Sequence, residues 1–331
     1  MIKKAMIMAA GVGSRLDPLT QEIPKPLVTV ANRPVMDILI EKLLDVSIRD
    51  VIANTHYLSD KIVQRYENND LGINFNYVFE EELSGTAGGV KKCQFFFDEG
   101  EDFLILSADG LSNADLKAGI ESHKKSGAIA TIGIKKIAPE EIPNFGVVVT
   151  DENGFITEFQ EKPSIQDAKS NYINTGIYIF NYEIFDYIPE NAFYDFAKNV
   201  FPELLSKGVK INTFHVSEYW SDIGTIDQYI QSTKDLFNNL LEINHSGIVK
   251  TAQGSYIMGK SDISPDANFI GFNTIGENCT IGKNVTLENC IIWDDVKIKD
   301  NLKLQNCVIA SNSEINTDLT QKIIGPNQNI S

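Results

Sequence analysis

The sequence contains few cysteines and histidines and is short of positive charge. Its 331 residues include 4 cysteines and 4 histidines, and neither type shows the Cys-x-x-Cys or His-x-x-x-His spacing of a metal site. Lysine and arginine number 29 against 45 aspartates and glutamates, so the formal net charge is −16. Nucleic acids and anionic membrane surfaces bind proteins that present a basic face. We therefore expect neither as a partner.

Long apolar runs are also missing. No stretch approaches the roughly 18 apolar residues that a membrane-spanning helix requires. The apolar run at residues 5–10 is too short for the core of a secretory signal peptide. We expect a cytoplasmic protein, and in that compartment Cys290 and Cys307 are expected to be reduced thiols rather than a disulfide.

A buried strand followed by a glycine loop opens the chain. Residues 5–10 are uncharged and are followed by Gly11 and Gly13, which predicts a buried strand with a loop at its carboxyl end. Ligands of open α/β sheets bind at this edge. Glycines there let backbone N–H groups approach a phosphate, and Arg15 and Lys25 add positive charge beside them. The stretch is typical of a phosphate-binding loop.

The spacing of this loop fits neither of two common phosphate motifs. Leu16 stands where the dinucleotide-binding fingerprint has its third glycine, and the Gly-Lys-Ser/Thr of a Walker A motif is missing. A plain turn between a strand and a helix would explain the glycines, but it requires neither Arg15 nor Lys25. We therefore interpret the stretch as a phosphate loop of a third kind. In so acidic a chain it must be a local basic island, to which Lys162 also belongs.

The first two thirds of the chain alternate between strand and helix patterns. Apolar residues at 35, 36, 39, 40, 43 and 44 have helical spacing, and strand-like runs follow near 51–53, 73–79, 103–106 and 128–134. This alternation predicts a Rossmann-like, mainly parallel sheet with helices on both faces. Residues 147–157 predict a hairpin, because Asp151-Glu152-Asn153-Gly154 is a turn-forming tetrad.

The last eighty residues repeat with a short period. Apolar residues recur every six positions, with two five-residue steps, so that each coil contains about 17 residues. They are Ile257, Ile263, Phe269, Ile275, Ile281, Leu287, Ile292, Ile298, Leu304, Ile309 and Ile315. Such a period indicates a parallel β-helix, in which each coil stacks its apolar residues on the next. We expect an α/β domain at residues 1–243 and a β-helix at residues 244–331.

Longer motifs make the opening of the chain specific. The stretch from Gly11 to Thr20, followed by Pro24-Lys25-Pro26, resembles the opening motif of the sugar-1-phosphate nucleotidyltransferases, also called nucleotide-sugar pyrophosphorylases. The resemblance extends over residues 1–243, and the tail resembles the left-handed β-helix of hexapeptide-repeat proteins. It implies a reaction in which a sugar 1-phosphate attacks the α-phosphate of a nucleoside triphosphate and pyrophosphate leaves.

This reaction needs no nucleophile from the enzyme, because the substrate phosphate attacks directly. Two anions must instead be neutralised and aligned, and Mg²⁺ suits that task because one or two carboxylates and phosphates can hold it. By resemblance, Asp109 and Asp222 are the metal ligands. Arg15 and Lys25 are the catalytic cations.

The resemblance also assigns residues to the two substrates. It implies nucleotide contacts from the first loop, from the Gly85-Thr86-Ala87-Gly88-Gly89 stretch and from one metal ligand, and sugar-phosphate contacts from three later motifs. The nucleotide-binding residues are Ala10, Gly11, Gly13, Gly85, Thr86, Gly88 and Asp109. The sugar-phosphate-binding residues are Gly146, Glu161, Lys162 and Asn174.

Several alternatives remain for the exact activity. The Gly-Thr-Ala-Gly stretch, the Phe-Gly-Val-Val stretch at residues 145–148 and the short tail look most like mannose-1-phosphate guanylyltransferases, which use GTP and form GDP-mannose. The same reaction could instead use glucose 1-phosphate with UTP, dTTP, CTP or ATP, or the chain could be an inactive regulatory paralogue.

The β-helix could have a role of its own. An acyltransferase role needs a general-base histidine, and His245 lies before the repeats. We expect it to mediate a homo-oligomer.

Overall fold

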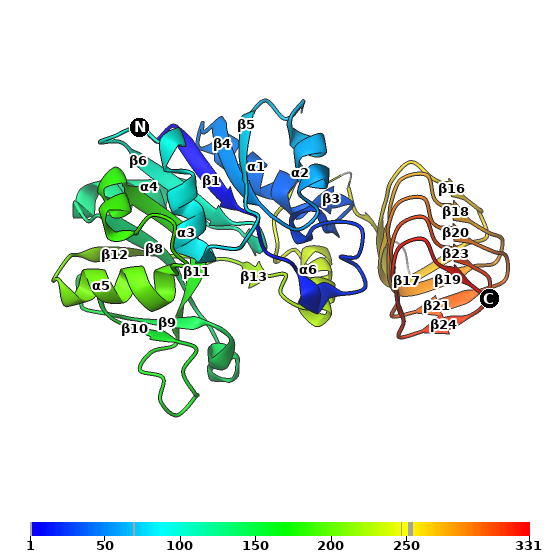
Figure 1. Cartoon of the computed structure of the whole chain (residues 1–331). Coiled ribbons are helices and arrows are strands. Elements are labelled where there is room, and N and C mark those ends of the chain that lie inside the picture. Colours follow the sequence, from blue (N-terminus) through cyan, green and yellow to red (C-terminus); the bar gives the residue numbers. More distant parts are fainter. Residues whose placement is uncertain (1, 69, 246, 251–253) are drawn as a thin grey trace. The chain divides into compact units, whose positions relative to one another are not determined.

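The computed structural model describes residues 2–68, 70–245, 247–250 and 254–331 (Figure 1). The chain forms two compact units. The first unit contains Met1–Val12 and Leu39–Trp220, and the second contains Gly13–Ile38 and Ser221–Ser331. The second unit therefore holds the segment with Arg15 and Lys25 as well as the repeats. The predicted domain boundary at residue 243 follows the change of repeat pattern and stays a prediction.

A nine-stranded mixed sheet forms the centre of the first unit. Its main order is β10-β9-β11-β6-β1-β4-β5, with β8 pairing β11 and β12. The strands are β1 (Lys4–Met8), β4 (Asp50–Thr55), β5 (Asn74–Phe79), β6 (Asp102–Ser107), β8 (Ala130–Lys136), β9 (Gly146–Thr150), β10 (Ile156–Glu161), β11 (Tyr172–Asn181) and β12 (Ile211–His215). β5, β4, β1 and β6 run parallel to one another, whereas β11 is antiparallel to β6, β8 and β9. The short strand β7 (Gly110–Ser112) follows β6.

Both faces of this sheet are buried. On β6, Phe103 and Ile105 point to one face and join the main aromatic core, and Leu104 and Leu106 on the opposite face are equally buried. A parallel sheet with two buried faces needs cover on both. The helices of this part of the chain are α1 (Val35–Asp45), α2 (Ser59–Tyr66), α3 (Gly85–Lys92), α4 (Leu116–Ser126) and α5 (Phe201–Ser206). The predicted Rossmann-like fold is confirmed.

Short helical segments of one or two turns connect several of these elements. They are η1 (Ser14–Leu16), η2 (Lys25–Leu27), η3 (Gln94–Phe96), η4 (Pro139–Asn144), η5 (Tyr182–Tyr187) and the π-helical turn η6 (Phe196–Val200).

The predicted hairpin at residues 147–157 is confirmed, since β9 and β10 pair antiparallel and Asp151 closes their turn by accepting from two backbone N–H groups. In the described part of the chain, no helix has the length and apolar content needed to cross a membrane.

The repeats form stacked coils of short parallel strands, drawn yellow to red in Figure 1. Leu287 pairs with Leu304 and Ile281 with Ile298, which is the 17-residue step that the sequence predicts. The last step shortens to 15 residues. The parallel strands are β15 (Gly254–Met258), β16 (Asp262–Ile263), β17 (Asn268–Ile275), β18 (Thr280–Ile281), β19 (Thr286–Ile292), β20 (Lys297–Ile298), β21 (Lys303–Gln305), β22 (Val308–Ile309), β23 (Glu314–Ile315), β24 (Leu319–Thr320), β25 (Ile323–Ile324) and β26 (Asn329–Ile330). The short strand β14 (Val249–Lys250) precedes them and pairs antiparallel with β15. The predicted parallel β-helix is confirmed.

Asparagines make the corners of these coils. Asn284 and Asn301 adopt left-handed backbone conformations with φ of 54° and 63°, which asparagine tolerates better than most residues. Their side chains also form a ladder along the coils, because Asn284 Nδ2 donates to Asn301 Oδ1 at 3.0 Å.

Cys290 and Cys307 occupy equivalent places on adjacent coils and are free, buried thiols, in line with the expected reduced state.

The coils pack against the N-terminal segment of the second unit. This unit also contains β2 (Thr29–Val30), β3 (Arg33–Pro34) and α6 (Ile226–Phe237), while β13 (Trp220–Asp222) lies where the chain enters it. Trp293 Nε1 on the β-helix donates to Tyr229 Oη on α6, and Tyr229 Oη donates to the carbonyl of Thr29, both at 2.8 Å. Asn32 Nδ2 donates to the carbonyl of Ile275 at 2.6 Å. The β-helix therefore supports the segment that carries the two predicted catalytic cations.

Candidate active site

The parallel strands bring several predicted residues to one sheet edge. Ala10 and Gly11 follow the carboxyl end of β1, and Asp109 follows the carboxyl end of β6. The two ends are joined, because the Ala108 N–H donates to the carbonyl of Met8 at 3.1 Å. Ser107 Oγ donates to Asp109 Oδ1 at 2.7 Å and orients the carboxylate. Asp109 therefore lies beside the start of the first loop, and its predicted roles toward a metal and a nucleotide stay predictions.

The second glycine stretch begins α3 at the same edge. Gly85 has a φ of 78°, and a Cβ there would collide with the backbone of Tyr194. A Cβ on Gly88 would lie 2.8 Å from the carbonyl oxygen of Ala192. Both glycines are thus required by the packing of the chain itself. Their role toward a nucleobase stays a prediction.

A segment that the sequence analysis missed binds this stretch tightly. The Tyr194 carbonyl accepts from the N–H groups of Ala87 and Gly88, both at 3.0 Å, and the Tyr194 N–H donates to the carbonyl of Ser84 at 2.8 Å. Residues 192–196, called the strap below, therefore hold the first turn of α3 through backbone hydrogen bonds. Backbone contacts leave no residue pattern, so the sequence gives no signal for them.

Thr86 and Asp195 add a side-chain link to the strap. Thr86 Oγ1 donates to Asp195 Oδ2 at 2.9 Å and accepts from the Phe196 N–H at 3.0 Å. The other oxygen of Asp195 caps η6 by accepting from the N–H groups of Ala197 and Lys198 at 2.9 and 3.3 Å. An aspartate before an apolar stretch is a recognisable N-cap signal, and that signal could have identified Asp195.

The predicted sugar-side residues lie together on three neighbouring strands. Gly146 pairs with Glu161 across β9 and β10, and a Cβ on Gly146 would lie 3.2 Å from Glu161 Oε2. Asn174 on β11 lies one step beyond the pair that joins Ile173 to β9. Its Nδ2 donates to Tyr178 Oη at 2.8 Å, which fixes the amide. Lys162 follows β10.

The electrostatics of Glu161 connect this cluster to the strap. Burial raises the pKa of the Glu161 carboxyl above its ordinary value, and the carboxylate of Asp195 raises it further. The ammonium groups of Lys162 and Lys198 act in the opposite direction but do not cancel the rise. Asp195 thus contacts the predicted base-side stretch through Thr86 and acts on the predicted sugar-side carboxylate through its charge.

In the second unit, the remaining predicted residues form two contacts. A Cβ on Gly13, whose φ is 71°, would lie 2.9 Å from Cβ of Lys25, so the loop and this lysine pack closely. Asp222 and Arg15 both lie beside Gly224, with Asp222 Oδ2 at 2.7 Å and Arg15 Nη2 at 3.4 Å from the position of a Cβ there. A predicted catalytic cation, Arg15, and a predicted metal ligand, Asp222, therefore both lie beside Gly224.

Asp109 in the first unit and Asp222 in the second unit are the two predicted metal ligands. Within the described residues, no group of three or more histidine, cysteine, aspartate or glutamate side chains could hold a metal alone. Mg²⁺ commonly takes one or two carboxylates and completes its shell with phosphates and water. Asp109 is oriented by Ser107, and Asp222 Oδ1 accepts from Gln228 Nε2 at 2.9 Å. Their sharing of one cation stays a prediction.

The first unit is a Rossmann-like α/β domain in which loops follow the carboxyl ends of neighbouring parallel strands at one sheet edge. The nucleotidyl transferase family matches residues 4–239, and the GMPPB C-terminal domain matches residues 252–328. The chain belongs to the nucleotidyl transferase family, and its predicted place among the sugar-1-phosphate nucleotidyltransferases is confirmed.

Similar proteins carry the names of several activities. A UTP–glucose-1-phosphate uridylyltransferase of Synechocystis sp. is 34% identical, with 88% of this chain and 83% of that protein covered. A mannose-1-phosphate guanylyltransferase of Mycobacterium tuberculosis is 28% identical, with 89% and 81% covered. A mannose-1-phosphate guanylyltransferase catalytic subunit beta of Drosophila melanogaster is 33% identical, with 83% and 72% covered.

A solved structure supports the fold. The crystal structure of a UDP-glucose pyrophosphorylase complexed with UDP-glucose aligns with a TM-score of 0.64 at 22% identity, covering 72% of this chain and all of that chain. At this identity the likeness concerns the fold alone.

The Thr86–Asp195 link predicts coupled effects on activity. Thr86→Val and Asp195→Asn should each lower kcat/KM for the sugar phosphate by about 5- to 30-fold, because each breaks the same hydrogen bond. The double variant should be no worse than the poorer single one, and Thr86→Ser should stay close to wild type. Steady-state kinetics on wild type and the four variants measure this, and fully multiplicative losses would contradict the link.

The charge of Asp195 predicts a shift in pH dependence. The Asp195 carboxylate raises the pKa of Glu161, so Asp195→Asn should lower that pKa and move the acid limb of the sugar-phosphate kcat/KM profile to lower pH. Thr86→Val breaks the same contact without changing the charge, and it should leave the limb in place. Profiles of wild type, Asp195→Asn and Thr86→Val test this over pH 4 to 8, which is about the range in which a glutamate with a raised pKa titrates. Equal shifts in both variants would refute the electrostatic cause.

Proposed function

We propose that the chain transfers the guanylyl group of GTP to mannose 1-phosphate, which forms GDP-mannose and pyrophosphate. The observation that carries this choice is the tail, since residues 252–328 match the GMPPB C-terminal domain. Several similar proteins with 28–33% identity are named mannose-1-phosphate guanylyltransferases, and they match over most of both chains. The Gly-Thr-Ala-Gly stretch at residues 85–88 agrees with this choice.

A second candidate pair is UTP with glucose 1-phosphate. The Synechocystis protein, at 34% identity, is named for this reaction. Base and sugar choice depend on a few hydrogen bonds, each contributing about 1 kcal/mol, so two members of one family can differ in substrates without differing in fold.

The proposed step needs alignment and charge neutralisation. An oxygen of the sugar phosphate forms a bond to the α-phosphorus of the triphosphate, while the bond from that phosphorus to the β-phosphate bridging oxygen breaks and pyrophosphate leaves. In this proposal Lys162 neutralises the sugar phosphate and Glu161 accepts from sugar hydroxyls. Arg15 and Lys25 neutralise charge on the triphosphate. Mg²⁺, when held by Asp109 and Asp222, supplies further neutralisation of the phosphates.

A matrix of substrates tests the proposed pair. Pyrophosphate release should be strongest with GTP and mannose 1-phosphate among the five triphosphates and two sugar phosphates considered above, with Mg²⁺ present. Strong release with UTP and glucose 1-phosphate alone would establish the second candidate. Asp109→Ala and Asp222→Ala should abolish turnover, which would also exclude an inactive regulatory paralogue.

Two lysine variants then test the division of roles. Lys25→Ala should mainly lower kcat, because its charge meets the developing pyrophosphate, whereas Lys162→Ala should mainly raise KM for the sugar phosphate. Lys169→Ala is the matched control, since this exposed lysine pairs only weakly with Glu158 on the surface. Equal effects on both constants in both variants would contradict the assignment.

We also propose that the β-helix mediates a homo-oligomer, because stacked coils end in unpaired strand edges that need cover. Light scattering at micromolar concentration should give a mass of at least twice the 36.8 kDa of one chain. A monomer at that concentration would refute this proposal.

A further inference from the structure

The last coil of the β-helix lies against the segment that joins the two predicted catalytic cations. This coil, residues 322–330, contains β25 and β26 and is drawn red in Figure 1. Both of its strands pair with the coil before it. Residues 18–22, called the bridge segment below, connect the turn that contains Arg15 to the turn that contains Lys25. The last coil and the bridge segment both belong to the second unit.

One column of side chains on the β-helix becomes smaller toward the last coil. Trp293, Ala310 and Gly325 each come directly after a paired isoleucine, so they occupy the same place on three successive coils. All three are buried, and the Trp293 indole donates to Tyr229 on α6. The decreasing side-chain size leaves room for a covering segment closest to the coil at Gly325.

The bridge segment occupies this room. A Cβ on Gly325 would lie 3.0 Å from the Cβ of Pro18, and 3.3 Å from both the Pro18 carbonyl oxygen and Gln21 Oε1. The first distance is shorter than the roughly 3.5–4.0 Å of an unstrained contact between carbon atoms. The backbone of Gly325 is itself held, because the buried Ser313 hydroxyl donates to its carbonyl at 3.1 Å. A side chain at position 325 would therefore displace the bridge segment.

A second contact holds the other end of the bridge segment. Asn327 Nδ2 donates to Glu22 Oε1 at 2.5 Å. Asn327 forms a corner of the last coil with a left-handed φ of 58°, and its N–H donates to the preceding coil at 3.0 Å. Pro18 lies three residues after Arg15, and Glu22 lies three residues before Lys25. The last coil thus contacts the bridge segment near both cations.

Hydrogen bonds within the N-terminal segment connect these contacts to the cations. The Thr20 hydroxyl donates to the carbonyl of Gly13 at 3.1 Å, and the Leu19 N–H donates to the turn that contains Arg15 at 2.9 Å. Gly13 in turn packs on Lys25, whose Cβ would lie 2.9 Å from a Cβ on the glycine. A displacement of the bridge segment would therefore change the positions of both cations.

We infer that the last coil positions the candidate active site, because Gly325 and Asn327 set the placement of Arg15 and Lys25 toward the triphosphate. This inference rests on the proposed nucleotidyl transfer. Both coil residues act through the bridge segment and contact no substrate. A coil that only stabilised the β-helix would behave differently, since its substitution would change the melting temperature without favouring one substrate over the other.

The first test fills the space at Gly325. Gly325→Val should lower kcat/KM for the triphosphate about tenfold, because displaced charges no longer align with the reacting phosphates. Gly325→Ala adds a single methyl group and should cause a smaller loss. KM for the sugar phosphate should change less than about twofold in both variants, since the predicted sugar-side residues belong to the first unit. Steady-state kinetics with each substrate varied in turn measure this difference.

The second test reverses the polarity of the Asn327–Glu22 contact. Asn327→Asp places two carboxylates together and should lower kcat/KM for the triphosphate about threefold. Glu22→Gln keeps an acceptor and should resemble wild type. In the double variant the introduced amide donates to the introduced carboxylate, so the value should return to within about twofold of wild type. Asn312→Asp is the matched control, because Asn312 forms the same left-handed corner one coil earlier, with a φ of 60°.

Two further measurements do not require turnover. Hydrogen exchange of residues 14–22 should be faster in Gly325→Val and Asn327→Asp than in wild type, and it should be restored in the double variant. Equilibrium binding of the magnesium–triphosphate complexes should show the same losses and the same recovery.

The outcomes separate the inference from the proposed function. A wild-type protein that turns over none of the substrate pairs would refute the proposed function alone, because exchange and affinity still test the coil. The inference fails if the coil variants lower the melting temperature but leave triphosphate kcat/KM and affinity unchanged. It also fails if both substrates are affected equally, or if the double variant is no better than Asn327→Asp.

Discussion

The parallel pairing of β5, β4, β1 and β6 is the constraint on which the first unit depends. Parallel strands place their carboxyl ends at one edge, and four consecutive ends here lead into the first loop, Asn54, Glu80 and Asp109. These residues are far apart along the chain. The register of the backbone hydrogen bonds, rather than any local motif, makes them neighbours, and the chemistry of the site follows from that arrangement.

Several glycines at this edge serve the protein's own packing. Gly85 and Gly88 make room for the strap, and Gly89 makes room for Asn54 and Glu80. A glycine-rich stretch is commonly interpreted as a surface for a ligand. Here close approach between chain segments explains the same residues, and it yields a rigid stretch whose backbone groups are held in place.

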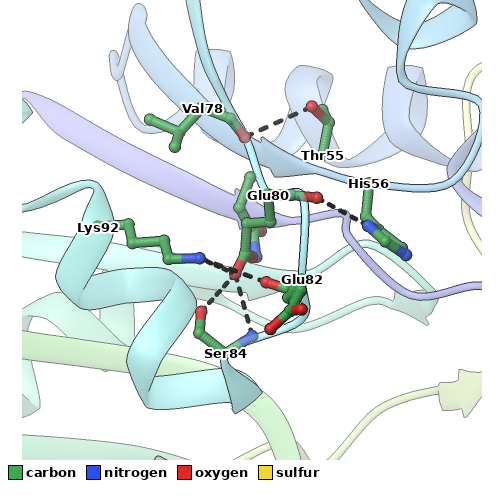
Figure 2. Close-up of polar contacts among 8 residues, drawn as sticks. Thr55, His56, Val78, Glu80, Glu82, Ser84 and Lys92 are labelled. Carbon is green, nitrogen blue, oxygen red and sulfur yellow. Dashed lines mark hydrogen bonds and ion pairs between the residues drawn. The ribbon is translucent and has the colours of Figure 1, made fainter. Parts of the chain in front are cut away.

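The strap and the buried side chain of Glu80 hold the start of α3 from two directions. The strap contributes backbone carbonyl and amide groups together with Asp195, while Glu80, whose side chain is 1% exposed, accepts from the Ser84 N–H at 3.2 Å (Figure 2). In the second unit, Trp293 and Tyr229 similarly connect the β-helix to the carbonyl of Thr29. The start of α3 and the segment at Thr29 thus each have polar contacts behind them that come from distant parts of the chain.

The sequence by itself determined the elements and the family. Apolar spacing predicted the helices and strands, and the recurrence of Leu287, Ile298 and Ile309 predicted the β-helix, because side chains that repeat with a fixed period must share one face. The glycines after residues 5–10 likewise predicted the loop that follows β1 at Gly11. Such signals are readable because the residues responsible lie within a few positions of one another.

Only the tertiary structure decided which distant residues meet. Nothing in the spacing connects Thr86 to Asp195, Ala9 to Glu80 or Trp293 to Thr29, and no predicted motif contains Asp195, Glu80 or Thr29. The physical reason is that these contacts depend on strand order and on backbone groups that every residue carries. The type of a residue determines which hydrogen bonds and charges its side chain can offer. The fold determines which distant group becomes its partner.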